Sequence, residues 1–303
     1  MHGEMTAAIR TEGLTKFYGK ERGIIDLDLE VNEGEVFGYL GPNGAGKTTT
    51  IRLLLDLLRP TRGTSRVLGK HPYFDGVGVR SDIGYLPGEL ALYGRLTGEQ
   101  LLTYISHLRK MGGLGEARLV ADRLELDLSR RIGDLSSGNK QKVGIVQAFM
   151  HHPKVLILDE PTGGLDPLMQ QEFFRLVHDA KEEGRTVFLS SHVLSEVERI
   201  ADRVGIIRRG RMVVVERLET LKARAPRRLD LHFAGPIPAV AFESLPNVED
   251  VWVDDTVVSC RVVGSVDGLI KAASRFEVTN VVSHEADLEE LFLRYYRGED
   301  DGS

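Results

Sequence analysis

Hydrophobic residues along this chain follow patterns that change from one segment to the next. Residues 36–40 and 155–158 are short, continuous apolar runs, typical of strands that are buried on both faces of a parallel sheet. Longer stretches have the spacing of helices, and from residue 155 onward they alternate with strands. The predicted helical stretches are 97–111, 116–126, 167–183 and 193–201. This order predicts an α/β fold whose parallel sheet is covered by helices on both faces.

A second pattern begins after Ala225-Pro226, where a predicted helix over 218–224 ends. We place a domain boundary there, which gives domains 1–225 and 226–303. The second domain alternates four predicted strands with helices in the order βαββαβ, which favours a small α+β unit of ferredoxin-like type. Its strands are 229–233, 248–253, 257–263 and 278–283, and its helices are 240–245, 265–276 and 287–296.

A glycine-rich run follows the first buried strand and opens a helix. Its residues are Gly41, Pro42, Asn43, Gly44, Ala45, Gly46, Lys47 and Thr48, followed by Thr49. Strand, glycine loop and helix together form a phosphate cradle, because successive backbone N–H groups and the positive helix end point at one anion. Lys47 can reach the β- and γ-phosphates, and the Thr48 hydroxyl can coordinate Mg²⁺. We predict that the chain binds a nucleoside triphosphate.

The strand over 155–158 ends in two carboxylates, Asp159 and Glu160. Asp159 is suited to hold Mg²⁺, and Glu160 can polarise an attacking water. Alone, such a pair is commonly a solvated turn. Together with the phosphate loop it predicts hydrolysis of ATP or GTP.

Three further segments of the sequence accompany the phosphate loop and the Asp-Glu strand. Leu135-Ser136-Ser137-Gly138 precedes a helical stretch, Gly163-Gly164-Leu165-Asp166-Pro167 follows the Asp-Glu strand, and His192 ends the strand over 186–190. In this order and spacing, about residues 5–220 resemble the ATP-binding subunit of ABC transporters. The resemblance implies a P-loop NTPase core of ABC type with a helical subdomain at about 90–150, and ATP with Mg²⁺ as its ligands.

The resemblance also implies roles for these residues. Ser136 and Gly138 would face the γ-phosphate held by a second subunit, Asp166 would link the two nucleotide sites, and His192 would contact the γ-phosphate and the attacking water. Ser136 also fits an ordinary N-cap, and so does Asp166, which can serve both purposes. A lone histidine such as His192 is more often a surface residue. The segment that begins with Leu135 matches the Leu-Ser-x-Gly signature of this family but departs from its commonest form. Ser137 replaces a glycine and Asn139 replaces a glutamine, so we expect altered rates of ATP hydrolysis rather than inactivity.

Two other positions bear on the nucleotide. Tyr18 matches the aromatic residue that stacks on adenine in this family. The alternative is a half-buried tyrosine of a strand with no role in binding, since aromatic residues are common in strands. In the family that the sequence resembles, the loop after residues 83–87 carries a glutamine that contacts Mg²⁺. Gly88 occupies its position here, and Glu89 is the nearest side chain that could replace it.

Composition is consistent with a peripheral ATPase. No apolar run approaches the length of a membrane span, and no signal-peptide core precedes the first strand. The single cysteine, Cys260, excludes an intramolecular disulfide and fits a reducing cytoplasm. Residues 225–303 carry 7 Lys and Arg against 15 Asp and Glu, a net charge of −8. Since the whole chain has a net charge of −6, residues 1–224 have a net charge of +2. No nucleic-acid partner is expected for such an acidic module.

We predict the ATP-hydrolysing subunit of an ABC efflux system for a drug, antibiotic or lipid-like compound, cytoplasmic and peripheral at the inner face of the cell membrane. It would pair with a second copy or a paralogue and with integral membrane permease subunits. An importer ATPase, or a soluble ABC ATPase acting on ribosomes or DNA, is the alternative. Leu90, Leu92 and Tyr93 could form the permease contact, or could be core.

Overall fold

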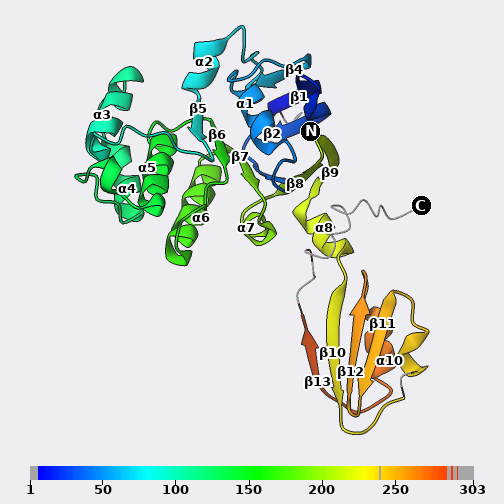
Figure 1. Ribbon diagram of the computed structural model, residues 1–303. Coiled ribbons are helices and arrows are strands. Elements are labelled where there is room, and N and C mark those ends of the chain that lie inside the picture. Colours follow the sequence, from blue (N-terminus) through cyan, green and yellow to red (C-terminus); the bar gives the residue numbers. More distant parts are fainter. Residues whose placement is uncertain (1–5, 239, 285–287, 289–291, 293–303) are drawn as a thin grey trace. The chain divides into compact units, whose positions relative to one another are not determined.

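The protein has two compact units, Met1–Val215 and Glu216–Ser303 (Figure 1). The structure, a computed structural model, describes residues 6–238, 240–284, 288 and 292. The part of the chain that it describes contains no helix long and apolar enough to cross a bilayer.

A six-stranded sheet forms the centre of the first unit, in the order β5-β6-β7-β3-β8-β9. From β5 to β8, neighbouring strands pair in parallel. The predicted continuous apolar runs form β3 and β6, which are buried along their whole length. The strands are β3 (Val36–Leu40), β5 (Ile83–Leu86), β6 (Val155–Asp159), β7 (Thr186–Ser191), β8 (Arg203–Arg208) and β9 (Arg211–Arg217).

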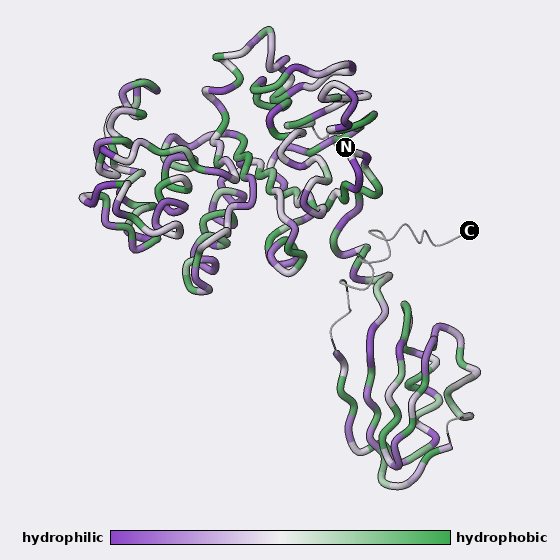
Figure 2. The backbone as a smooth tube through the Cα atoms, viewed as in Figure 1, coloured by the Kyte–Doolittle hydropathy of each residue, from purple (hydrophilic) through white to green (hydrophobic). Residues whose placement is uncertain are grey.

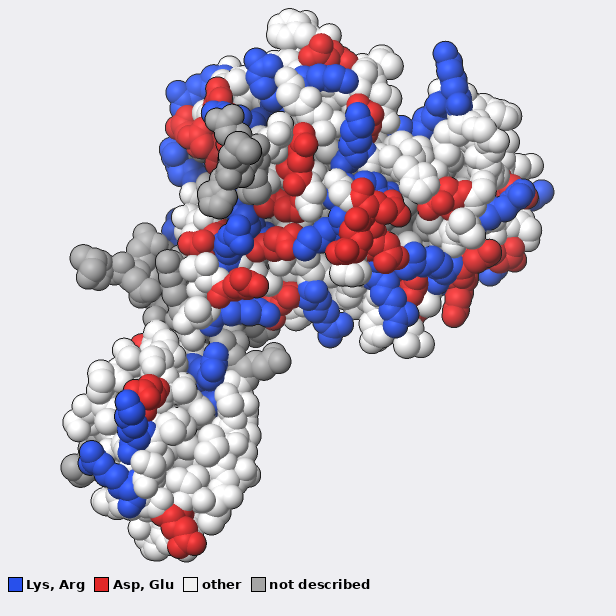
Figure 3. Space-filling model, turned by 180° about the vertical axis from the view of Figure 1, so that it is seen from behind, with Lys and Arg blue, Asp and Glu red and all other residues white. Residues whose placement is uncertain are grey.

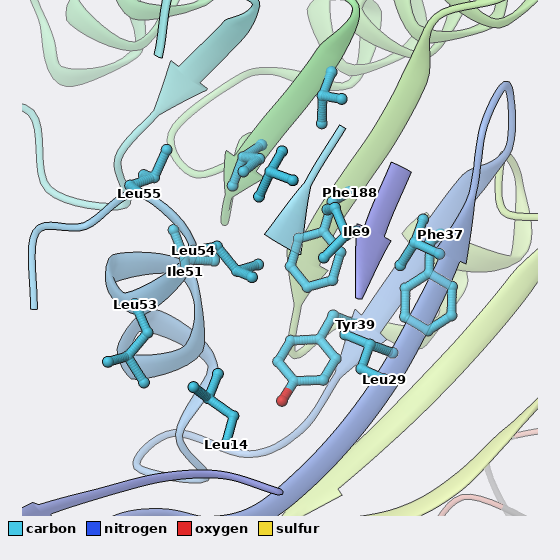
Figure 4. Packing of buried hydrophobic residues seen from close by; sticks show 14 of the residues in the cluster. Ile9, Leu14, Leu29, Phe37, Tyr39, Ile51, Leu53, Leu54, Leu55 and Phe188 are labelled. Carbon is cyan, nitrogen blue, oxygen red and sulfur yellow. The ribbon is translucent and has the colours of Figure 1, made fainter. Parts of the chain in front are cut away.

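A second, antiparallel sheet has the order β2-β1-β4, and its strands are β1 (Ala7–Tyr18), β2 (Glu21–Asn32) and β4 (Arg62–Val67). The main hydrophobic core includes residues of both sheets and of α1 (Lys47–Leu54). Figure 4 shows Ile51 of α1 and Tyr39 of β3 in this core. The Tyr39 hydroxyl lies 3.1 Å from Thr50 Oγ1, and burial raises the pKa of Tyr39. This packing fixes the helix that follows the phosphate loop.

Helices occupy the stretch between β5 and β6. They are α3 (Gly98–Leu108), α4 (Gly115–Arg123), the 3₁₀ turn η1 (Ile132–Asp134) and α5 (Ser137–Phe149). A capping box between Thr97 and Gln100 begins α3. The helix ends at Leu108 instead of the predicted residue 111, because Lys110 adopts a positive φ of 56°. The short helix α2 (Gly76–Ser81) was not predicted.

Two helices flank β7. The helix α6 (Pro167–Glu182) begins as predicted at its proline, with Asp166 as N-cap. The helix α7 (Leu194–Glu198) is shorter than the predicted 193–201. Both pack against β7. Because β6 and β7 pair in parallel, the segments that follow them lie at the same edge of the sheet.

The second unit is a four-stranded antiparallel sheet in the order β11-β12-β10-β13. Along β10, apolar residues alternate with polar ones, and Leu229, Leu231 and Phe233 pack in a core with residues of α9 and α10 (Figure 2). Both helices are shorter than predicted. The elements are α8 (Leu218–Arg224), β10 (Arg227–Phe233), α9 (Val240–Glu243), β11 (Val248–Asp254), β12 (Val257–Val262), α10 (Asp267–Ala273) and β13 (Val278–Ser283). Of the predicted helix over 287–296, only Leu288 and Phe292 are described, and both are helical and buried; the remainder lies outside the described residues.

A polar cluster lies on β10 and its neighbours. Burial would raise the pKa of the Asp230 carboxyl, but hydrogen bonds from Ser259 (2.6 Å), His284 (2.8 Å) and Arg228 (3.0 Å) outweigh it and hold that pKa at about 2. Asp230 therefore stays ionised at neutral pH. Burial raises the pKa of Cys260 to about 11, so this thiol remains protonated as a core residue of β12.

Candidate active site

The glycine loop runs from the end of β3 into α1. Gly46 is the residue before α1, with a positive φ of 116° and no side-chain cap, so the first N–H groups of the helix are left without a side-chain acceptor there. A side chain at Gly46 would also collide with Ile24, because its Cβ would lie 2.7 Å from Cγ2 of that residue. The loop conformation therefore depends on glycine and leaves a helix N-terminus available to an anion.

Lys47 is folded over this loop and is only 6% exposed. Its Nζ donates a hydrogen bond to the Gly41 carbonyl oxygen at 2.6 Å and lies 3.1 Å from Glu160 Oε1. The ammonium is thus held between the phosphate loop, which follows β3, and the carboxylate of Glu160, which follows β6.

Asp159 is buried at the end of β6, beside the phosphate loop. The Thr48 hydroxyl donates a hydrogen bond to its Oδ2 at 2.8 Å, and the Ser190 hydroxyl of β7 donates to its Oδ1. Ser190 was not among the predicted site residues, and its position two residues before His192 in a strand is its only signal in the sequence. The two hydroxyls orient Asp159 towards the loop.

Glu160 and His192 meet at the same edge of the sheet. Glu160 has a positive φ of 49°, and its backbone N–H donates to the Ser190 carbonyl oxygen at 3.1 Å. This turn directs its carboxylate to His192, whose Nδ1 lies 2.8 Å from Glu160 Oε2. The Glu160 carboxylate thus lies between a lysine on one side and an imidazole on the other. His192 is not an isolated surface histidine.

The donor set suits a magnesium ion shared with phosphate. Thr48 and Asp159 supply a hydroxyl and a carboxylate oxygen next to each other, and Mg²⁺ prefers one or two such protein ligands together with phosphate oxygens and water. Among the described residues, no group of three or more His, Cys, Asp or Glu side chains could hold a metal by itself.

Gly88 lies beside this donor set. A Cβ on Gly88 would lie 3.4 Å from Asp159 Oδ2, so the position expected to carry glutamine directly adjoins the carboxylate. Glu89 is exposed, and the described contacts include none from its side chain to Thr48 or Asp159.

A cavity of about 250 Å³ adjoins the phosphate loop, and Tyr18, Lys47, Thr48, Thr49 and Glu160 are among its lining residues. The Tyr18 hydroxyl lies 3.3 Å from Thr49 Oγ1, and its ring is 43% exposed. Arg22 also lines the cavity. Arg22 was not among the predicted site residues, because a single arginine at the start of a strand belongs to no motif.

Ser136, Gly138 and Asp166 do not line this cavity. Ser136 caps α5 by accepting the Asn139 N–H at 3.3 Å, and Asp166 caps α6 by accepting the N–H groups of Leu168 and Met169 at 3.0 Å. The loop before α6 closely approaches the start of α5, since a Cβ on Gly138 would lie 2.4 Å from the carbonyl oxygen of Gly164. Within one chain they form a separate cluster.

The parallel sheet, the glycine loop and the carboxylates at the end of β6 make this chain a P-loop nucleoside triphosphatase. It matches the ABC transporter family over residues 24–163. It is 34% identical to the bacitracin transport ATP-binding protein BcrA of Bacillus licheniformis, over 97% of this chain and 99% of the relative. It is also 34% identical to the linearmycin resistance ATP-binding protein LnrL of Bacillus subtilis, over 94% and 97%.

Solved structures agree with this. A structure of the ATP binding subunit of an ABC transporter, 31% identical, matches with a TM-score of 0.66 over 72% of this chain and 92% of that chain. The dimeric structure of MJ0796, a bacterial ABC transporter cassette, is 24% identical and shares the fold with a TM-score of 0.64 over 69% and 98%. The chain therefore belongs to the ABC transporter ATP-binding proteins. It is an ATP-hydrolysing subunit of such a transporter, related to antibiotic and multidrug transport ATPases.

Proposed function

We propose that this chain powers efflux of an antibiotic, drug or lipid-like compound through separate membrane subunits, from the cytoplasmic face of the cell membrane. The observation that carries the proposal is the extent of the similarity to BcrA and LnrL. It covers 97% and 94% of this chain, so it includes the second unit as well as the ATPase core.

The residues around the phosphate loop would bind ATP. Lys47 Nζ, already beside the Gly41 carbonyl, is positioned to contact the β- and γ-phosphates, and the N–H groups at the start of α1 would donate hydrogen bonds to the same phosphates. Tyr18 and Arg22 line the same cavity, where the exposed Tyr18 ring offers adenine a stacking surface.

Thr48 and Asp159 would hold Mg²⁺, which supplies neutralisation of the phosphate charge that develops during hydrolysis. The contribution of the chain is to keep the two oxygens adjacent, through the hydrogen bond between them and the Ser190 hydroxyl behind Asp159. Glu89 stays a weaker candidate for this site, since its side chain is exposed.

Glu160 would orient and deprotonate the attacking water. Its carboxylate is held from two sides, by Lys47 Nζ at 3.1 Å and by His192 Nδ1 at 2.8 Å, so it cannot rotate freely away from the loop. When Lys47 turns to phosphate, His192 would still position Glu160, and its imidazole can offset negative charge that develops beside it.

A second subunit would complete each site. Ser136, Gly138 and Asp166 are absent from the cavity lining of their own chain and cluster at the starts of α5 and α6. The backbone N–H groups at the start of α5 form an anion site that could cap the γ-phosphate bound by a partner subunit. We propose that two copies, or this chain and a paralogue, enclose two ATP molecules in this way.

The permease would contact the loop after β5. In that loop Tyr93 is 65% exposed, whereas Leu90 packs near Gly144 of α5, with its Cδ2 2.8 Å from where a Cβ on that glycine would lie. Leu92 is half-buried. Tyr93 is therefore the residue of this loop best suited to anchor a partner helix.

We also propose that the second unit is ferredoxin-like. Its elements follow one another as βαββαβ, its strands pair antiparallel in the order β11-β12-β10-β13, and α9 and α10 share one core with the sheet. These features support the assignment of this α+β fold.

Reconstitution with a membrane permease that co-purifies with this chain tests the function. Inside-out vesicles that carry both proteins should accumulate a labelled antibiotic when MgATP is added, whereas vesicles with Glu160→Gln should not. ATP-driven uptake in the opposite direction would indicate an importer. Co-purification with ribosomes or DNA instead of membrane proteins would refute the transport assignment.

A further inference from the structure

A second cavity in the first unit, of about 390 Å³, is lined by α6 and the residues after α7. Each of its titratable lining residues is basic: Arg175, His178, Lys181 and Arg199. On the face of this unit that Figure 3 shows, acidic and basic side chains are interspersed. A larger cavity of about 630 Å³, for example, has Asp82, Glu33 and Glu183 among its lining residues, together with basic ones. The cavity beside α6 differs from this one and from the cavity at the phosphate loop, because its lining, among the described residues, contains no acidic residue.

Nearby carboxylates pair with two of the four basic residues. Glu172 is shared between Arg175 at 3.0 Å and Arg123 at 2.6 Å. Asp202 accepts a hydrogen bond from Lys181 at 2.6 Å, and its second oxygen accepts the Val36 N–H at 2.9 Å.

Arg199 lies over the Phe174 ring at 5.8 Å and makes no ion pair among the described residues. Since Arg175 and Lys181 are paired with carboxylates, the positive charge of this cavity that is left without an ion pair among the described residues is that of Arg199.

The cavity also has an apolar wall. Val36, Phe174 and Ile200 contribute to its lining, and Phe174 is 8% exposed. Phe174, Arg175, His178 and Lys181 follow one another on α6 at spacings of one, three and three residues, so that the ring and the basic groups share one face of the helix. A volume of this size, with apolar walls and a few convergent polar groups, suits a small organic ligand.

We propose that this cavity is a second anion site, separate from the phosphate loop, for a small organic molecule that carries a phosphate or carboxylate group on an apolar body. Arg199 would bind the anionic group, and Lys181 and Arg175 would donate to it through the N–H groups that do not face Asp202 and Glu172. The apolar body would lie against Phe174 and Ile200. Arginine suits this role, because its guanidinium group binds phosphate and carboxylate through paired hydrogen bonds.

Calorimetric titration of the full chain tests the proposal, with MgADP at saturation to occupy the phosphate loop. Phenyl phosphate and benzoate probe the two possible anionic groups, inorganic phosphate provides the charge alone, and benzyl alcohol the apolar body alone. At least one of the two aromatic anions should bind about tenfold more tightly than inorganic phosphate, because it also buries apolar surface. Benzyl alcohol should show no binding at the same concentrations. The affinity should fall as salt is added.

Variants locate the binding. Arg199→Gln should weaken binding of the aromatic anion on the order of tenfold, because it removes a charge-assisted hydrogen bond, and adding Arg175→Gln should weaken it further. Arg95→Gln, which changes an exposed arginine outside the cavity, and Lys47→Ala should leave this binding unchanged. Arg199 is itself exposed, so its single variant should fold normally. The proposal is overturned if neither aromatic anion binds the wild type, if Arg199→Gln binds equally well, or if Lys47→Ala abolishes the binding.

Discussion

Replacing Glu160 by glutamine separates ATP binding from ATP hydrolysis. Glutamine keeps the length of the side chain and its Cβ, so it adds no strain to a backbone that already has a φ of 49° at this position. It removes the negative charge that lies 3.1 Å from Lys47 Nζ and 2.8 Å from His192 Nδ1. Lys47 then has no anionic competitor to phosphate, and ATP should bind as tightly as in the wild type or more tightly.

Hydrolysis should instead fall steeply. Loss of a general base reduces rates on the order of 10²–10⁴-fold, which corresponds to about 3–5 kcal/mol of activation free energy. Single-turnover assays with radiolabelled ATP, combined with equilibrium binding of a fluorescent ATP analogue, measure both effects. Glu183→Gln serves as a control, because its carboxylate pairs with Arg185 at 2.9 Å outside the ATP cavity. Wild-type turnover in Glu160→Gln would show that this carboxylate neither positions nor activates water.

The remaining predictions concern binding, assembly, docking and stability. Lys47→Ala should weaken ATP binding itself by at least tenfold in the same binding assay, and unchanged affinity would contradict its phosphate role. MgATP should convert Glu160→Gln from monomer to dimer in light scattering, whereas a monomer at saturating ATP would argue against self-association. Tyr93→Ala should leave the melting temperature and ATP binding of the isolated subunit unchanged but weaken permease binding by about 2 kcal/mol or more; a lower melting temperature would indicate a core residue. Because the folded pKa of Asp230 lies below its unfolded value, its stabilisation is complete above about pH 4 and is lost as the pH falls through 2. Asp230→Asn should therefore lower the free energy of unfolding on the order of 2 kcal/mol at pH 7, followed by the single tryptophan, and a deficit equally large at pH 2 would refute this.

Local sequence was sufficient wherever a feature depends on neighbouring residues. The phosphate loop was predictable because one contiguous run contains the strand, the glycines and the helix that follows. The caps at Ser136 and Asp166 were predictable because an N-cap bonds N–H groups only two or three residues away. The order of elements in the second unit was predictable for the same reason, while helix ends were less accurate: a single positive φ at Lys110 ended α3 early.

Tertiary structure decided which of these residues meet. Lys47, Glu160 and His192 follow three different strands, and they converge because β6, β7 and β3 are adjacent and parallel in the central sheet. Their strand order is set by packing and hydrogen bonding between distant segments, which no local pattern encodes. The Ser190 hydroxyl behind Asp159, the approach of Gly138 to Gly164, and the four basic residues around one cavity have the same origin. The sequence thus determined the chemical groups and their local conformations, and the packing of the sheet and helices determined their mutual distances.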